Sequence, residues 1–280
     1  MSVQWPLLLF SVLLGTSSGM LVYLGIHEAR GRRATASFMI ALTALVLLGV
    51  GGIASTFHLG HPERALHIMG NMGSGLSREL IGVGVTAVVT LAYAVCVRMS
   101  YASAAKGLGF CAIVVGAVLP VIAGSSFMMA ARPTWDSATL PLMYLGGGLG
   151  LGFTLAAAIA CAKGAEAAER AFAAKLALAG AAAAAVTALI WVAWVALAPY
   201  PDASRSIMRL AAGDLAALFW IGAVALGVVA PCVLCWMARR ADAKRMLAYV
   251  SGAFVCLLAG SVALRVIMYA VATSVQQLIY

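Results

Sequence analysis

The side chains best suited to chemistry lie in one polar segment, from Phe57 to Glu79. It reads FHLGHPERALHIMGNMGSGLSRE and holds three of the four histidines of the chain. A histidine titrates close to neutral pH, so it can accept a proton that a substrate releases. A carboxylate at the same place can relay that proton onward. The pattern indicates proton-coupled chemistry, with His58 and Glu79 as the candidate catalytic groups.

A further charged residue, Arg265, lies inside an apolar run near the C-terminus. An ionisable side chain within a membrane span is costly, so we expect Arg265 to face the protein interior and to have a partner. Glu79 and Asp214 are the acids that we expect within its reach. A place in a substrate pocket and a structural ion pair are both open readings for Arg265.

The scaffold that must position these residues is a membrane protein. Of the 280 residues, 64% are hydrophobic and only 10% are charged, whereas soluble domains carry about 25% charged residues. This composition excludes a self-contained soluble enzyme, a disulfide scaffold and a nucleic-acid binder, despite the net charge of +9. Eight apolar stretches are each long enough to cross a bilayer as a helix. They are residues 6–26, 36–57, 79–97, 107–130, 139–162, 174–198, 214–237 and 247–271.

The predicted fold is therefore all-α, a single domain over residues 1–280 with eight transmembrane helices. Twelve lysines and arginines fall in the loops after the odd-numbered spans, five fall on the opposite side, and Arg265 lies within a span. By the positive-inside rule, the side with twelve is cytoplasmic and both termini are periplasmic. A cluster of tryptophans near the outer boundary is expected to form an aromatic belt. It consists of Trp5, Trp135, Trp191 and Trp194.

Two glycine-rich patches, at 49–52 and 145–152, indicate close packing between helices in lipid. The periplasmic loop 58–78 is expected to contain a short interfacial helix that begins near Pro62. Ser77 is the predicted N-cap of the third span, with Glu79 in its first turn.

Because His58 closes the second span and Glu79 opens the third, both are predicted at the same membrane surface, where they can share a pocket. Simpler readings remain: His58 capping carbonyl groups, and Glu79 favouring the helix dipole, which is worth about 0.3–1 kcal/mol.

Three runs resemble a known family. ASTFHLGHPERALH and SGLSREL look like the second loop of the membrane-anchor subunit of bacterial dimethyl sulfoxide reductases. GSVALRVIMYA, which contains Arg265 and Tyr269, is similar to the last helix of that family. The resemblance implies an inner-membrane anchor that binds and oxidises menaquinol in anaerobic respiration. It also implies that a histidine and a glutamate of the loop bind quinol, and these match His58 and Glu79.

The resemblance further implies two periplasmic partners, a four-cluster iron–sulfur subunit that accepts the electrons and a molybdopterin catalytic subunit. The chain would then be catalytic only within the complex. Arg64 is either a docking residue for the iron–sulfur subunit or a surface charge that contacts lipid phosphate. The full set of candidate quinol-binding residues is His58, Arg64, Ser77, Glu79, Arg265 and Tyr269.

No metal site or haem is expected in this chain. The Cys232–Cys235 pair has no second pair to complete a zinc or iron–sulfur site, and His27 lies on the opposite side from the other histidines. Two alternative functions stay open. One is the anchor of a polysulfide or tetrathionate reductase-type complex, and the other is a secondary transporter, although the chain shows no inverted repeat.

Overall fold

The computed structural model describes residues 3–57, 74–197 and 203–272, and this part of the chain is helical without a β-strand. Eight of its helical stretches are long and apolar enough to cross a membrane, which confirms the all-α, eight-span prediction. The elements are α1 (Trp5–Ala29), α2 (Ser37–Thr56), α3 (Gly75–Arg98), α4 (Ala102–Ser125), α5 (Thr139–Ala162), α6 (Ala167–Leu197), α7 (Ala203–Ala211), η2 (Leu218–Val229), α8 (Ala230–Ala238) and α9 (Ala243–Ala270). Such helices satisfy their own backbone hydrogen bonds, as a lipid environment requires.

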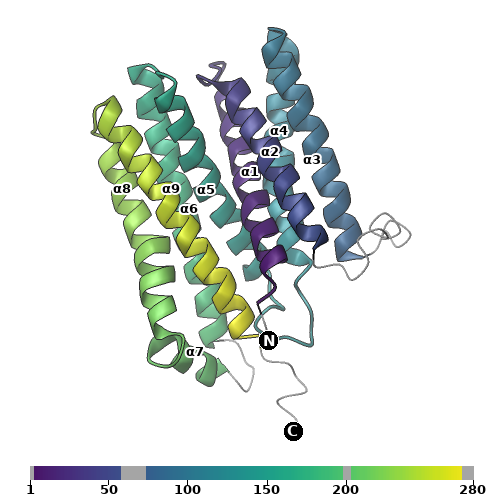
Figure 1. Ribbon diagram of the computed structural model, residues 1–280, viewed down its shortest axis with the longest axis vertical. Coiled ribbons are helices and arrows are strands. Elements are labelled where there is room, and N and C mark those ends of the chain that lie inside the picture. Colours follow the sequence, from purple (N-terminus) through teal and green to yellow (C-terminus); the bar gives the residue numbers. More distant parts are fainter. Residues whose placement is uncertain (1–2, 58–73, 198–202, 273–280) are drawn as a thin grey trace.

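The eight spans form two groups of four that lie side by side (Figure 1). In the first group, α1 contacts α2 and α4, and α3 packs between α2 and α4. In the second group, α5 packs against α6 and α9, and α9 also packs against η2 and α8. The seventh span is made of two elements, because η2 winds as a π-helix and continues directly as α8.

Helix α1 joins the two groups, because it contacts α2, α4, α5 and α9 and is largely buried. Its contact with α5 depends on glycine. A Cβ atom on Gly19 or on Gly152 would collide with the backbone of the facing helix. The glycine-rich patch 145–152 therefore packs closely, as predicted. The patch 49–52 does so only at Gly51, since Gly49 and Gly52 have open space beside them.

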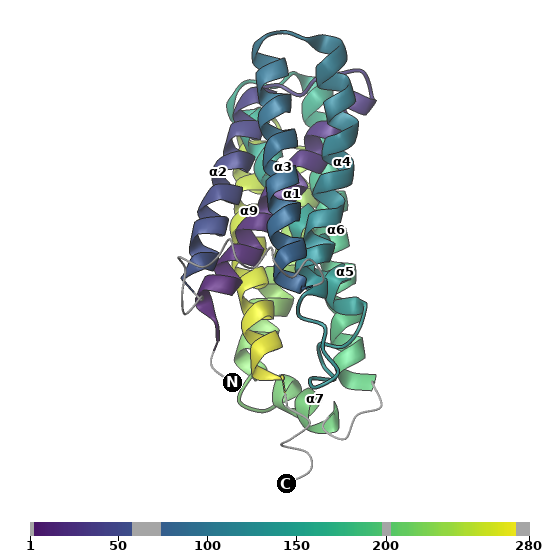
Figure 2. The same cartoon turned by 90° about the vertical axis from the view of Figure 1, so that its right-hand side faces the viewer.

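The two ends of the bundle differ in what they carry. At one end α2 and α4 finish and α3 and α5 begin, and the short helix α7 lies there as well (Figures 1 and 2). We call this end, which carries Glu79, the Glu79 end. The opposite end, where α1 finishes, is called the His27 end. Helix α1 starts and α9 finishes at the Glu79 end.

Two of the four tryptophans predicted to face lipid are buried instead. Trp135 is 2% exposed and Trp191 is fully buried, so the aromatic-belt prediction is wrong for both. Trp5, at 59% exposed, fits the prediction. Both rings have protein neighbours in the hydrophobic core. Trp135 lies in the loop before α5, which packs on the end of the bundle, and Trp191 lies on the inward face of α6.

Candidate functional site

The first turn of α3 is fixed by Ser74. Its side chain accepts a hydrogen bond from the backbone N–H of Ser77 at 3.1 Å, and the two hydroxyl oxygens lie 2.8 Å apart. Ser74 is thus the N-cap, and the prediction that Ser77 has this role is wrong because the helix begins nearly a turn earlier. Ser77 is buried within the first turn. Glu79 lies just beyond the first turn, so its predicted place there is also wrong.

Glu79 points into the protein and is only 6% exposed. Its hydrogen-bonding neighbour is the side chain of Ser126, which follows the last residue of α4. Ser126 also packs against Gly75, where an added Cβ would lie 3.1 Å from the serine side chain. Within the described residues, Glu79 forms no ion pair. A buried acid that no salt bridge neutralises is well suited to exchange protons.

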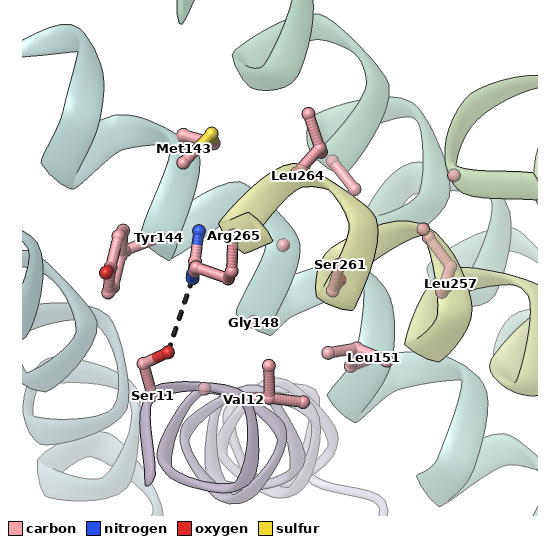
Figure 3. Close-up of a pocket in the computed structure, with 15 residues that line it drawn as sticks. Ser11, Val12, Met143, Tyr144, Gly148, Leu151, Leu257, Ser261, Leu264 and Arg265 are labelled. Atoms are coloured by element: carbon pink, nitrogen blue, oxygen red, sulfur yellow. Dashed lines mark hydrogen bonds between the residues drawn. The ribbon is translucent and has the colours of Figure 1, made fainter. Parts of the chain in front are cut away.

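Arg265 is buried between α9, α1 and α5 and is 5% exposed. Its Nε donates to the Ser11 hydroxyl at 3.3 Å, and its guanidinium carbon lies 3.4 Å from the centroid of the Tyr144 ring (Figure 3). The ring face is the electron-rich side of an aromatic group, so it stabilises the cation. The adjoining cavity has a volume of about 20 Å³, which is room for one water-sized group. A quinol ring does not fit on this side of Arg265.

The acids expected beside Arg265 are not its partners. Asp214 instead accepts two hydrogen bonds from Arg209, at 2.9 and 2.7 Å. These bonds hold the pKa of the Asp214 carboxyl below its usual value. Among the described residues no acid forms an ion pair with Arg265. The prediction of an ionic partner is therefore wrong there, since the aromatic ring of Tyr144 takes that place.

Tyr269 belongs to an aromatic cluster at the Glu79 end of the bundle, next to Arg265. The ring centroid of Tyr269 lies 5.6 Å from that of Trp135 in an edge-to-face arrangement. The ring centroids of Phe127 and Tyr144 are 5.9 Å apart. The Trp135 indole donates to the carbonyl of Met268 at 2.9 Å and fixes the loop 126–138 against α9. The Tyr269 hydroxyl is buried and has no hydrogen-bond partner among the described residues.

Three of the predicted site residues, Glu79, Arg265 and Tyr269, thus act electrostatically on Tyr144, which the sequence did not single out. Glu79 interacts electrostatically with both Tyr144 and Tyr269, and Arg265 interacts with the same two side chains. Phe127 and Tyr144 belong to the aromatic cluster described above. The only indication of this aromatic cluster in the sequence is Trp135, which lies among polar residues in a short connection between two spans.

The other predicted site residues lie outside the described residues. These are His58 and Arg64, and the predicted interfacial helix falls in the same part of the chain. The shared pocket of His58 and Glu79 stays a prediction. Thr56, the last residue of α2, and Gly75, the first residue of α3, lie at the same end of the bundle, as that prediction requires.

The arrangement can do a defined kind of chemistry. A buried carboxylate can take a proton, a buried phenol can donate a hydrogen bond, and aromatic faces can hold a flat ring. The fold and site therefore define a polytopic helical membrane protein with a buried acid and an aromatic cluster at one end.

Comparison with known proteins gives the family. The family model described as "DMSO reductase anchor subunit (DmsC)" matches residues 1–271. The chain therefore belongs to the family of membrane-anchor subunits of dimethyl sulfoxide reductase-type complexes.

A curated relative supports this membership. The chain is similar to the "Anaerobic dimethyl sulfoxide reductase chain YnfH" of Escherichia coli (strain K12), with 40% identity over 85 residues. The match covers 28% of this chain and 28% of the relative. The chain thus spans less than a third of the curated relative that it matches.

Proposed function

We propose that this anchor binds menaquinol at the Glu79 end and oxidises it, passing the electrons to an iron–sulfur subunit that supplies a molybdopterin catalytic subunit. The observation that carries the proposal is the buried Glu79 carboxylate, which has no ion pair among the described residues and interacts with two buried tyrosines. Family membership supports the same role. It also favours the dimethyl sulfoxide reductase type over the polysulfide and tetrathionate reductase types.

The chemistry requires a proton acceptor because oxidation of a quinol to a quinone releases two electrons and two protons. Glu79 accepts a proton from one hydroxyl of the quinol as the electrons leave. Tyr269, whose hydroxyl has no described partner, donates a hydrogen bond to a quinol oxygen. Arg265 acts through Tyr144, because its guanidinium lies against the ring and does not face an open site. His58 is the proposed second proton acceptor.

The isoprenoid tail of the quinol has a suitable groove next to Glu79. An apolar cavity of about 340 Å³ lies between α3 and α4, and Arg78 is at one end of it. Because Arg78 precedes Glu79, the groove starts beside the proposed ring site and runs along the lipid-facing surface. A tail there remains in contact with the bilayer. The groove is lined by Arg78, Ile81, Gly82, Val85, Thr86, Val114, Val115, Val118, Leu119 and Ile122.

The proposed orientation puts the Glu79 end and both soluble partners on the periplasmic side of the bacterial inner membrane. Its support is the excess of lysine and arginine in the connections at the His27 end, which the positive-inside rule assigns to the cytoplasm. Protons from the quinol would then be released into the periplasm. Labelling of single cysteines in the 31–36 and 126–138 connections, in intact cells, tests this orientation.

The experiment that tests the function is reduction of the iron–sulfur subunit by a reduced naphthoquinone in membranes holding the whole complex. Electron paramagnetic resonance detects the reduced clusters. We expect rapid cluster reduction only when the anchor is present together with its soluble partners. Equal reduction of the soluble subunits without the anchor would contradict the proposal.

A further inference from the structure

A second polar site lies at the His27 end, on the opposite side of the bundle from Glu79. It is a pocket of about 320 Å³ between the α1–α2 connection and the start of α6. This volume is at the lower limit of small-molecule sites, which span roughly 300–1,000 Å³. The pocket is therefore far larger than a single ion needs. We call it the His27 pocket.

Contacts between segments distant in the sequence hold the walls of the His27 pocket. Glu169 accepts hydrogen bonds from the backbone N–H and the hydroxyl of Thr35, which ties the start of α6 to the α1–α2 connection. The guanidinium carbon of Arg30 lies 3.8 Å from the centroid of the Phe172 ring. These contacts fix the positions of one acid and one base on the rim.

His27 supplies a buried polar atom at this pocket. Its side chain lines the pocket and is 3% exposed. The imidazole ring is tilted against the Tyr23 ring and lies edge-to-face with the Phe172 ring. The Nε2 atom is buried and has no hydrogen-bond partner among the described residues. Buried polar atoms in folded proteins nearly always have a partner.

The charges around the pocket are of both signs. Arg33 forms a 2.8 Å ion pair with Glu28, which also accepts a hydrogen bond from Tyr93, so Arg33 is already neutralised. The other charged groups that line the pocket are two bases and two acids. They are Arg30, Arg32, Glu166 and Glu169.

We propose that the His27 pocket binds the phosphoethanolamine headgroup of a membrane phospholipid. The phosphate fits the guanidinium groups of Arg30 and Arg32, because guanidinium matches phosphate geometry with paired N–H donors. The primary ammonium fits the carboxylates of Glu166 and Glu169. A purely anionic headgroup would supply no cation to either carboxylate. A choline headgroup carries the positive charge but has no N–H group to donate.

The position of the pocket agrees with a lipid ligand. It lies at the end of the transmembrane bundle, where lipid headgroups are found, and charged pockets between helices at that depth can bind them. The proposal is independent of quinol chemistry, since the pocket is at the other end of the helices from Glu79. Its ligand would fasten the α1–α2 connection to α6.

The first test measures thermal unfolding of the purified full-length chain in detergent with added phospholipid at equal mole fractions. Phosphatidylethanolamine is expected to raise Tm by several degrees more than phosphatidylcholine or phosphatidylglycerol. Equal shifts for the three lipids would overturn the proposal. A shift of the same size with soluble O-phosphoethanolamine, without lipid, would overturn the lipid assignment and leave a soluble phosphorylated amine as the ligand.

Substitutions of two exposed residues test recognition of the phosphate and of the ammonium group separately. Arg32→Gln is expected to weaken binding of phosphatidylethanolamine and phosphatidylglycerol alike, by about tenfold, because it removes one charged donor to the phosphate. Glu166→Gln is expected to weaken only phosphatidylethanolamine. Arg98→Gln, an exposed arginine at the same end that does not line the pocket, is the matched control.

Native mass spectrometry of the retained lipids gives the affinities directly. Loss of the preference for phosphatidylethanolamine in Glu166→Gln, with Arg98→Gln unchanged, supports the proposal. Wild-type binding in both pocket variants, or an equal loss in the Arg98 control, would overturn it.

Discussion

Replacing Glu79 by glutamine tests whether the Glu79 carboxyl group has a catalytic or a structural role. Glutamine has nearly the same shape and still hydrogen-bonds to Ser126, but it cannot take up a proton. A positioned general base contributes about 10²–10⁴-fold to a rate, so we expect naphthoquinol oxidation by the complex to slow by about that factor. Stability should change in the other direction. Glu79 is 6% exposed and has no ion pair among the described residues, and removing a buried unpaired charge is stabilising.

The assay measures two quantities on the same complex, naphthoquinol-driven electron delivery in washed membranes and Tm in detergent. We expect Glu79→Gln to lower the first severely while Tm is unchanged or higher. Asp136→Asn is the control, since Asp136 is an exposed acid at the same end of the bundle. Turnover within twofold of wild type in Glu79→Gln would refute the role of Glu79. A large fall in Tm together with the lost turnover would show that the acid is structural.

Four further predictions concern the same end. His58→Ala should leave the complex assembled and slow electron delivery from the quinol; normal turnover would remove His58 from the site. Arg64→Glu should release the soluble subunits from washed membranes more than it changes quinone affinity, and unchanged retention on immunoblots would argue against docking there. Arg265→Leu should lower turnover with little change in Tm, because the lost contact with the Tyr144 ring is offset by removal of a buried charge; a large loss of Tm with full turnover would mean a structural role. Val118→Phe, at a half-exposed position in the α3–α4 groove, should raise KM for a long-tailed naphthoquinol but not for a tail-less one, and Val88→Phe on the exposed face of α3, outside the groove, is its control.

The number of membrane helices follows from the sequence because each span needs a long apolar run, and each such run is visible. Their starts follow less well. The third span begins at Gly75 although Ser77, Arg78 and Glu79 are polar, because Ser74 caps the helix and Glu79 turns inward. The sixth span begins at Ala167, seven residues before its predicted start. Long charged side chains at a helix end can extend to the membrane surface while the backbone stays helical.

The charged members of the candidate site were predictable from the sequence. Of its aromatic members, Tyr269 was predicted through the family resemblance, and Tyr144 and Phe127 were not. Glu79 and Arg265 stand out because charges are rare in apolar spans. Tyr144 does not stand out, since an aromatic residue in a membrane helix usually only packs. The partner of Arg265 depends on how α5 and α9 are rotated about their axes. Hydropathy does not determine that rotation, so an acid was expected where the structure has the Tyr144 ring.

The way in which the two buried charges are held bears on the proposed reaction. Glu79 has the neutral neighbour Ser126, and Arg265 has the neutral neighbours Ser11 and Tyr144. Neither charge is neutralised by contact with the other, and both act electrostatically on Tyr144 and Tyr269. A neutral quinol enters and a neutral quinone leaves, and a proton taken up by Glu79 removes the negative charge of its carboxylate. The neighbouring cation Arg78, which acts electrostatically on Glu79, then favours loss of that proton, which resets the site for the next quinol.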